Sequence, residues 1–250
     1  MTKTDLMSID LESRDRLNEE LGGGFPPGSI VLIEGEFEAG KSVLTQRITK
    51  GLLEEDYLVT YLSTELSISN ALSQMSSLRF NIEEHLLDGE LLFLHADIDH
   101  GSPYANEGKG ERKQLLRRLM EADVMWEADA ILIDAFDDIL RNDPTFEALV
   151  RENEERQAAL EIISFFRDLI STGRLVLITI DPSSVHDTAI DPFRAIADAH
   201  LKIEMVEVGN EIRRGISVKR FSGMGGQVGD RIGFSVRSDA GIVIESRSVA

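Results

Sequence analysis

The chain has 250 residues, of which 42% are hydrophobic, so it can bury a large core. Its 45 acidic and 26 basic residues give a net charge of −19, and such a surface repels the phosphate backbones of nucleic acids. The absence of cysteine excludes disulfides and thiolate metal sites. There is no apolar run of membrane-spanning length and no signal-like N-terminus, so we expect a cytoplasmic protein with one domain, residues 1–250.

A phosphate-binding motif follows the first apolar segment. Residues 35–42 read Gly-Glu-Phe-Glu-Ala-Gly-Lys-Ser, a complete G-x-x-x-x-G-K-S pattern, and Ile30 to Ile33 before them predict a strand. In this motif the lysine reaches the β and γ phosphates, the serine hydroxyl coordinates Mg²⁺, and the N-terminus of the next helix faces the phosphates. We therefore expect a nucleoside triphosphate to contact Gly35, Glu36, Phe37, Glu38, Ala39, Gly40, Lys41, Ser42 and Val43. The alternative is an ordinary glycine turn.

The remaining segments alternate between strand and helix patterns, which predicts a parallel sheet with crossover helices. We expect strands at 58–62, 91–94, 130–133 and 175–180, and helices at 67–78, 81–87, 113–122 and 151–172, the last ending at Gly173. Loops are expected at 97–110 and after residue 180, where Pro182 and Pro192 stand. From His200 the apolar period changes to two, which predicts antiparallel strands at one edge of the sheet, ending at 242–245.

A metal-orienting carboxylate is expected where a neighbouring buried strand ends, because Mg²⁺ needs hard oxygen ligands. Asp134 directly follows the apolar residues 131–133, which is the Walker B arrangement. We predict that Asp134 and Ser42 hold the metal. The alternative is that Asp134 caps the next element. Asp137 and Asp138 are interpreted as solvated loop charges.

Hydrolysis also needs a group that orients water beside the γ-phosphate. Glu65 follows the strand at 58–62, at the edge where ligands of open α/β sheets bind, and is the catalytic candidate. The alternative is that Glu65 stabilises the start of the helix near Ser67 through the helix dipole. Thr179 and Asp181, where another apolar strand ends, are further candidates for sensing the γ-phosphate.

Segments 21–30, 35–42, 63–65, 131–134 and 218–221 together resemble the RecA/KaiC-like ATPases. Within that superfamily, segments 38–47 and 61–66 are most similar to FlaH/ArlH, the accessory ATP-binding proteins of the archaeal flagellum (archaellum) motor. The resemblance implies a RecA-like α/β fold with a mostly parallel sheet, and ATP and Mg²⁺ as ligands. It also implies a homo-oligomeric ring in some states, and it names the hexameric motor ATPase and the membrane-platform ring as partners, which would bring the protein to the inner face of the membrane.

Three departures from the family pattern bear on hydrolysis. Glu38 occupies a loop position that is often glycine, and only Glu65 stands where KaiC carries two adjacent glutamates. Lys219 and Arg220 are adjacent, whereas the KaiC interface motif has its lysine and arginine two residues apart. Because adjacent strand residues face opposite sides, at most one of them can reach a neighbouring subunit's phosphate. These departures predict ATP binding with slow or no hydrolysis.

The main functional hypothesis is a nucleotide-controlled regulatory and assembly factor of a motor. One alternative is a DNA recombination ATPase of RecA or RadB type, which needs basic loops to bind phosphates. Residues 135–157 instead contain seven acidic residues and three arginines, so we expect no nucleic acid partner. A second alternative is a KaiC-like signalling ATPase, although a single domain argues against it. No direct membrane insertion is expected.

The acidic excess is spread along the chain, and only 7 of the 26 basic residues are lysine. This pattern is typical of whole-surface adaptation to salt, so we predict a halophilic protein rather than an ordinary acidic one. Molar KCl is expected to raise the free energy of unfolding, measured by urea titration at several salt concentrations. A free energy that does not respond to salt would remove the hypothesis.

Overall fold

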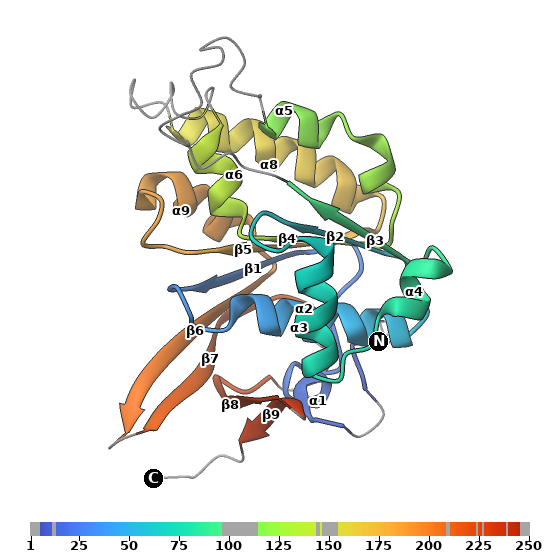
Figure 1. The fold of residues 1–250 in the computed structure, drawn as a ribbon. Helices are drawn as coiled ribbons and strands as arrows, with labels where there is room; N and C mark the ends of the chain where they lie inside the picture. Colours follow the sequence, from blue (N-terminus) through green and yellow to red (C-terminus); the bar gives the residue numbers. More distant parts are fainter. Residues whose placement is uncertain are drawn as a thin grey trace, which may run out of the picture.

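The computed structural model describes residues 6–11, 14–96, 115–143, 146, 155–208, 211–223, 225–226, 228–238 and 240–245 (Figure 1). The helices are α1 (Leu17–Glu20), α2 (Lys41–Glu54), α3 (Ile68–Ser77), α4 (Glu83–Leu87), α5 (Leu115–Met120), η1 (Asp123–Trp126, a 3₁₀ helix), α6 (Phe136–Asn142), α8 (Glu155–Ser171) and α9 (Asp187–Ile196). The strands are β1 (Ile30–Gly35), β2 (Val59–Ser63), β3 (Leu91–His95), β4 (Ala130–Asp134), β5 (Leu175–Ile180), β6 (Ala199–Val208), β7 (Glu211–Phe221), β8 (Arg231–Arg237) and β9 (Gly241–Glu245).

In the described part of the chain, the strands form one sheet in the order β3-β2-β4-β5-β1-β6-β7-β8-β9. The pairings from β3 to β6 are parallel, and β1 lies between β5 and β6. The pairings from β6 to β9 are antiparallel. Both the parallel sheet and the antiparallel edge predicted from the change of apolar period are confirmed.

Each central strand is buried on both faces. Val31 and Ile33 of β1 belong to a cluster that includes residues of α2 and α3, whereas Ile30 and Leu32 face a cluster built with α5, α6, α8 and α9. The two groups of helices cover opposite faces of the sheet (Figure 1). Two-sided burial explains why these strands are continuous apolar runs rather than alternating patterns.

Four helices were absent from the sequence prediction: the short α1 and η1, and the longer α6 and α9. The predicted loop after residue 180 contains α9, with Pro192 inside it. Proline costs a helix one hydrogen bond, but Ala189, Ile190 and Phe193 of α9 are completely buried, and their packing outweighs that loss. The segment after Asp134, read as a loop, forms α6.

Most other elements match their predictions within two residues at each described end. Gly173 has φ +90° and follows the end of α8, as expected of a helix-terminating glycine. The predicted loop at 97–110 and residues 151–154 of the predicted long helix lie outside the described residues. In the parts of the chain that the structure describes, no helix has both the length and the apolarity that crossing a membrane requires.

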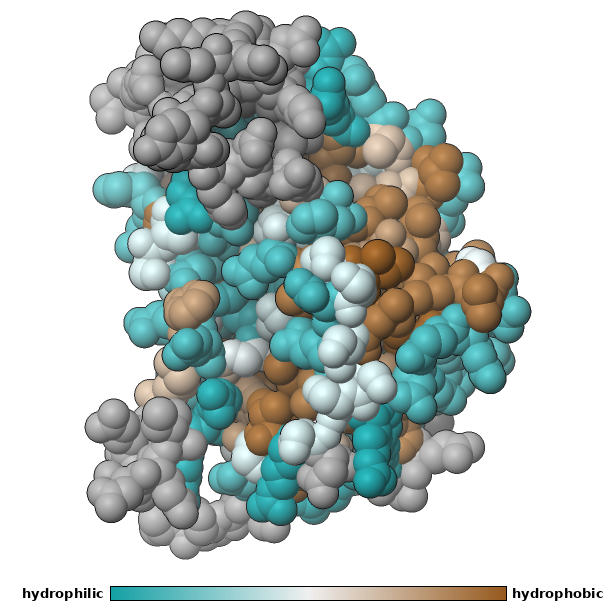
Figure 2. Space-filling model, in the orientation of Figure 1, coloured by the Kyte–Doolittle hydropathy of each residue, from teal (hydrophilic) through white to brown (hydrophobic). Residues whose placement is uncertain are grey.

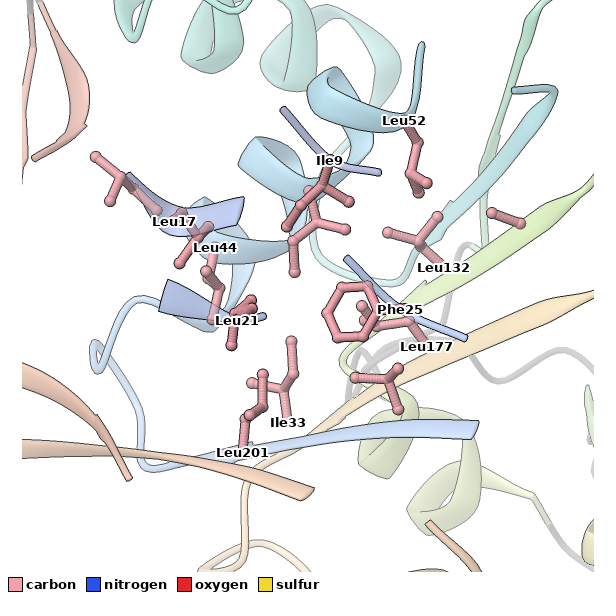
Figure 3. Close-up of a cluster of buried hydrophobic side chains, with 14 of the residues drawn as sticks. Ile9, Leu17, Leu21, Phe25, Ile33, Leu44, Leu52, Leu132, Leu177 and Leu201 are labelled. Carbon is pink, nitrogen blue, oxygen red and sulfur yellow. The ribbon is translucent and has the colours of Figure 1, made fainter. Parts of the chain in front are cut away.

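The chain before β1 forms part of the core, which the sequence analysis did not predict. Ile9, Leu17, Leu21 and Phe25 are fully buried and lie beside side chains of α2 and the sheet (Figure 3). Gly51 permits this approach, because a Cβ there would lie 2.3 Å from the carbonyl oxygen of Ile9.

A buried ion pair holds this segment to α2. Arg47 donates to both carboxylate oxygens of Asp15, at 2.6 and 2.8 Å, and to the carbonyl oxygen of Ile9 at 2.8 Å. The side chains of Arg47 and Asp15 are 0% and 4% exposed. The buried charge of Arg47 therefore has its counter-charge in the N-terminal segment.

We predict that Asp15→Asn lowers the free energy of unfolding by about 3–5 kcal/mol, because it leaves the buried Arg47 without its counter-charge. Urea unfolding measures the loss. Arg16→Ala is the matched control, since its pair with Glu20 is more exposed and is worth less than about 1 kcal/mol. Equal effects of the two substitutions would show that the Arg47 pair adds nothing to stability.

Candidate functional site

The loop between β1 and α2 closes around the amine of Lys41. Lys41 Nζ donates hydrogen bonds to the carbonyl oxygens of Gly35 at 2.7 Å and Glu36 at 3.0 Å. A Cβ on Gly35 would lie 3.2 Å from the Cβ of Ala39 and 3.3 Å from Lys41 Cγ, so a larger residue would crowd the loop. Gly40 has φ +102°, a conformation that favours glycine, and directly precedes α2. The backbone of the loop thus folds closely around the amine of Lys41.

The remaining loop residues face outward. Phe37 is 71% exposed, and Glu36 and Glu38 are exposed as well. Glu38 has φ +62°, and its carbonyl oxygen accepts a hydrogen bond from Arg214 Nη2 at 3.4 Å. The exposed carboxylate of Glu38 is therefore not enclosed by the loop, where it would repel a phosphate.

Asp134 ends β4 and is 1% exposed. Its two carboxylate oxygens accept hydrogen bonds from Tyr61 Oη and Thr179 Oγ1, each at 2.9 Å. Burial, followed by the charge of Asp134, raises the pKa of Tyr61 well above its ordinary value, so the phenol remains a donor. Thr179 also accepts from the backbone N–H of Ala135, the first residue after β4. Two neighbouring strands therefore fix the orientation of this carboxylate.

Glu65 lies in the electrostatic field of the same edge. Partial burial of its carboxyl, then repulsion from Asp134 and Asp138, raises the pKa of Glu65, and the charge of Lys41 partly offsets this. The residue as a whole is exposed. Ser67, not Glu65, caps α3, because its side chain accepts from the backbone N–H of Asn70. The capping alternative for Glu65 is not supported by these contacts.

The interpretation of Asp137 and Asp138 as solvated loop charges is wrong. Both lie in the first turn of α6 and are 4% and 7% exposed. Asp137 accepts from Ser184 Oγ and from the backbone N–H of Asp181, and burial raises its pKa despite these hydrogen bonds. Asp138 accepts from Thr64 Oγ1 and pairs with Arg141. An amphipathic reading of residues 136–142 could have revealed this helix.

The other candidates make contacts within the chain. Thr179 is fully buried against Asp134, and the carboxylate of Asp181 accepts from the N–H and hydroxyl of Ser183. Arg220 Nη1 donates to three carbonyl oxygens at the C-terminal end of α9, those of Arg194, Ala195 and Ala197. Lys219 is exposed and lies 3.8 Å from Glu204. Of these two adjacent cations, Lys219 therefore has fewer and longer contacts with charged or carbonyl groups of its own chain.

Sequence reasoning missed a charge cluster beneath the loop. Glu34, the residue before Gly35, is 2% exposed, and Arg194 of α9 donates to both its oxygens at 2.7 and 2.8 Å. His200 Nε2 of β6 lies 3.0 Å from the same carboxylate. Burial alone would raise the pKa of Glu34, but Arg194 and His200 outweigh burial and lower it to about 2. A glutamate inside an apolar strand was the available signal that a partner was needed.

These residues fit a magnesium nucleotide. Lys41 lies at the start of α2, where the N-terminal N–H groups of the helix would also meet an anion, and the carboxylate of Asp134 is held in place at the end of β4, at the same edge of the parallel sheet. No group of three His, Cys, Asp or Glu in the described residues is arranged to hold a metal alone. Mg²⁺ bound with nucleotide phosphates requires no such group, because phosphate and water oxygens supply most of its ligands.

The sheet order and the loop define the class of RecA/KaiC-like ATPase folds. The family model for the KaiC ATPase matches residues 15–248. The archaeal flagellar ATP-binding protein FlaH of Methanocaldococcus jannaschii is 30% identical over 98% of both chains, and that of Methanococcus voltae is 28% identical over 97% of this chain and 98% of its own.

Solved structures agree. The crystal structure of the flagellar accessory protein FlaH from Methanocaldococcus jannaschii superposes with a TM-score of 0.83 and 28% identity, covering 97% of this chain and 100% of that chain. A KaiC-like protein from Pyrococcus horikoshii matches the fold, with a TM-score of 0.69 and 19% identity over 93% and 96% of the two chains. This chain belongs to the KaiC family of ATPases and, within it, to the archaeal flagellar ATP-binding proteins FlaH.

We predict that Asp134→Asn weakens ATP affinity about 10–100-fold in the presence of Mg²⁺ but much less in EDTA, because it removes a charge that helps hold the metal. Titrations of a fluorescent ATP analogue with and without EDTA measure the difference. Asp129→Asn is the control, since that exposed aspartate lies before the opposite end of β4. Equal losses in both titrations would place the metal ligand elsewhere.

Proposed function

We propose that this protein binds ATP with Mg²⁺ and serves as a regulatory and assembly component of the archaellum motor. The proposal is supported by a complete phosphate loop at the same edge of the sheet as an oriented Asp134, in a chain that matches FlaH over nearly its whole length. Residues 1–250 act as a single ATP-binding domain. Its acidic surface argues against nucleic acid as the partner.

Different residues of the site bind the phosphates and the metal. Lys41 and the N–H groups of loop 35–43 bind the β and γ phosphates, and Gly35 and Gly40 allow the backbone to close around them. Ser42 and Asp134 hold Mg²⁺, which neutralises charge between the phosphates. Tyr61 and Thr179 hold the carboxylate of Asp134 in a fixed orientation.

Hydrolysis by the isolated protein is slow or absent. Glu65 is the carboxylate proposed to orient water, and its pKa is raised first by burial and then by the charges of Asp134 and Asp138, which also repel an incoming anion. An arginine supplied by another subunit is worth roughly 10³ to 10⁵ in rate. Arg220 is engaged with the end of α9 in its own chain, which leaves the exposed Lys219 to reach a neighbour.

Binding of ATP, rather than its hydrolysis, therefore controls the state of the protein. The ATP-loaded form docks to the motor ATPase and the membrane-platform ring and joins a homo-oligomeric ring, provided ATP favours the docking conformation. The protein works in the cytoplasm, held by these partners at the inner face of the membrane.

We predict that Glu65→Gln abolishes residual ATP turnover while leaving ATP affinity and docking to the motor ATPase within about twofold, since the substitution keeps the shape and removes only the base. Single-turnover hydrolysis, nucleotide titration and a pull-down with the motor ATPase measure the three quantities. Lys41→Ala is the paired variant, and it should lose ATP binding and docking together with an unchanged circular dichroism spectrum. Wild-type turnover near the ordinary enzyme median of ~10 per second without partners would refute control by binding alone.

A further inference from the structure

Within the described residues, the edge strand β3 carries none of the features that usually protect an edge against pairing. In the described part of the chain its strand partner is β2, so its outer edge faces away from the sheet. Its sequence, Leu-Leu-Phe-Leu-His, contains no proline, glycine, lysine or acidic residue, and its pairing with β2 shows no bulge. Natural edge strands are normally blunted by such features, because bare N–H and C=O groups invite another strand.

Two exposed apolar side chains lie on short helices next to this part of the sheet, Leu87 just before β3 and Val124 before β4. Leu87, at the end of α4, is 87% exposed, and its neighbour Leu86 packs on the cluster that includes α2. Val124 in η1 is 68% exposed, and Met125 and Trp126 beside it belong to the cluster on the opposite face. Figure 2 shows hydrophobic residues gathered over β3 and beside α4. An added strand would thus find apolar side chains near both α4 and η1.

Acidic residues surround these apolar positions. Glu83, Glu84 and Asp88 are exposed around Leu87, and Asp123 and Glu127 are exposed around Val124. Of the exposed arginines on the nearby α5, Arg117 is already paired with Glu121. Two copies of this surface would repel one another, because each presents the same carboxylates. Charge complementarity therefore selects a basic partner.

We infer that the β3 edge is a docking surface for a partner protein that adds a basic, extended segment with alternating apolar side chains. Backbone hydrogen bonds to residues 91–95 supply the pairing, Leu87 and Val124 contact the apolar side chains, and the surrounding carboxylates select lysine and arginine. The surface lies outside the phosphate loop, so this inference does not depend on the proposed control by ATP.

The test uses a fluorescein-labelled heptapeptide, KVRIKVR, and the full chain. Fluorescence anisotropy is expected to show saturable binding that weakens with salt, and hydrogen exchange is expected to show protection of residues 91–95. Leu87→Gln and Val124→Gln should each weaken binding about tenfold or more, because each removes an apolar contact that the bound segment would cover, without adding charge. Leu160→Gln, on the half-exposed apolar residue of α8, is the control and should bind normally.

Two further peptides separate pairing from charge. EVDIEVD should bind at least about tenfold more weakly, and KVRPKVR should also lose binding, because proline lacks the N–H needed for strand pairing. No binding of KVRIKVR, equal binding of KVRPKVR, or insensitivity to both glutamine variants would overturn the inference. So would sedimentation showing a dimer of this chain that Leu87→Gln dissociates, since a second copy would then be the occupant.

Discussion

The neutralisation of one buried carboxylate supports the geometry of the phosphate loop. Glu34 precedes the loop inside the most central part of the sheet, where an unpaired charge would cost several kcal/mol. Arg194 reaches it from α9 and His200 from β6, so three separate elements are joined directly beneath Gly35. Arg220 extends the connection to β7 by binding the carbonyl oxygens at the end of α9. The residue that precedes the loop is therefore held by charged side chains of α9 and β6, and α9 is held in turn by Arg220 of β7.

Periodicity and motif spacing were enough to predict the parallel sheet, its antiparallel edge and the two ends of the site, the loop at 35–42 and Asp134. These features are encoded locally, in continuous apolar runs and in glycines at fixed intervals. The helix α9 was missed because Pro192 is a local signal for a loop, whereas the buried side chains of Ile190 and Phe193 that stabilise the helix depend on contacts with distant strands. Tertiary packing overrode the local preference.

The partners of the charged residues were beyond prediction for the same reason. Nothing near Asp15 in the sequence indicates Arg47, and nothing near Asp134 indicates Tyr61 or Thr179. Burial of Asp137 and Asp138 likewise depends on the packing of α6 against the sheet. Sequence patterns locate charges that need partners, but the fold decides which partners they receive. In this chain those pairings give most of the carboxylates at this edge a hydrogen-bonding partner.

The position of β1 also governs when the chain can fold as it leaves the ribosome. Both strands that border β1 come late, since Ile30 pairs with Val176 and Val31 with Ala199. At roughly 5–20 residues per second, the phosphate loop therefore waits on the order of ten seconds or more for its neighbours to be synthesised. Until then β1, which contains both apolar residues and Glu34, has no neighbouring strands with which to pair. Competence to hold a nucleotide is consequently among the last properties that the nascent chain acquires.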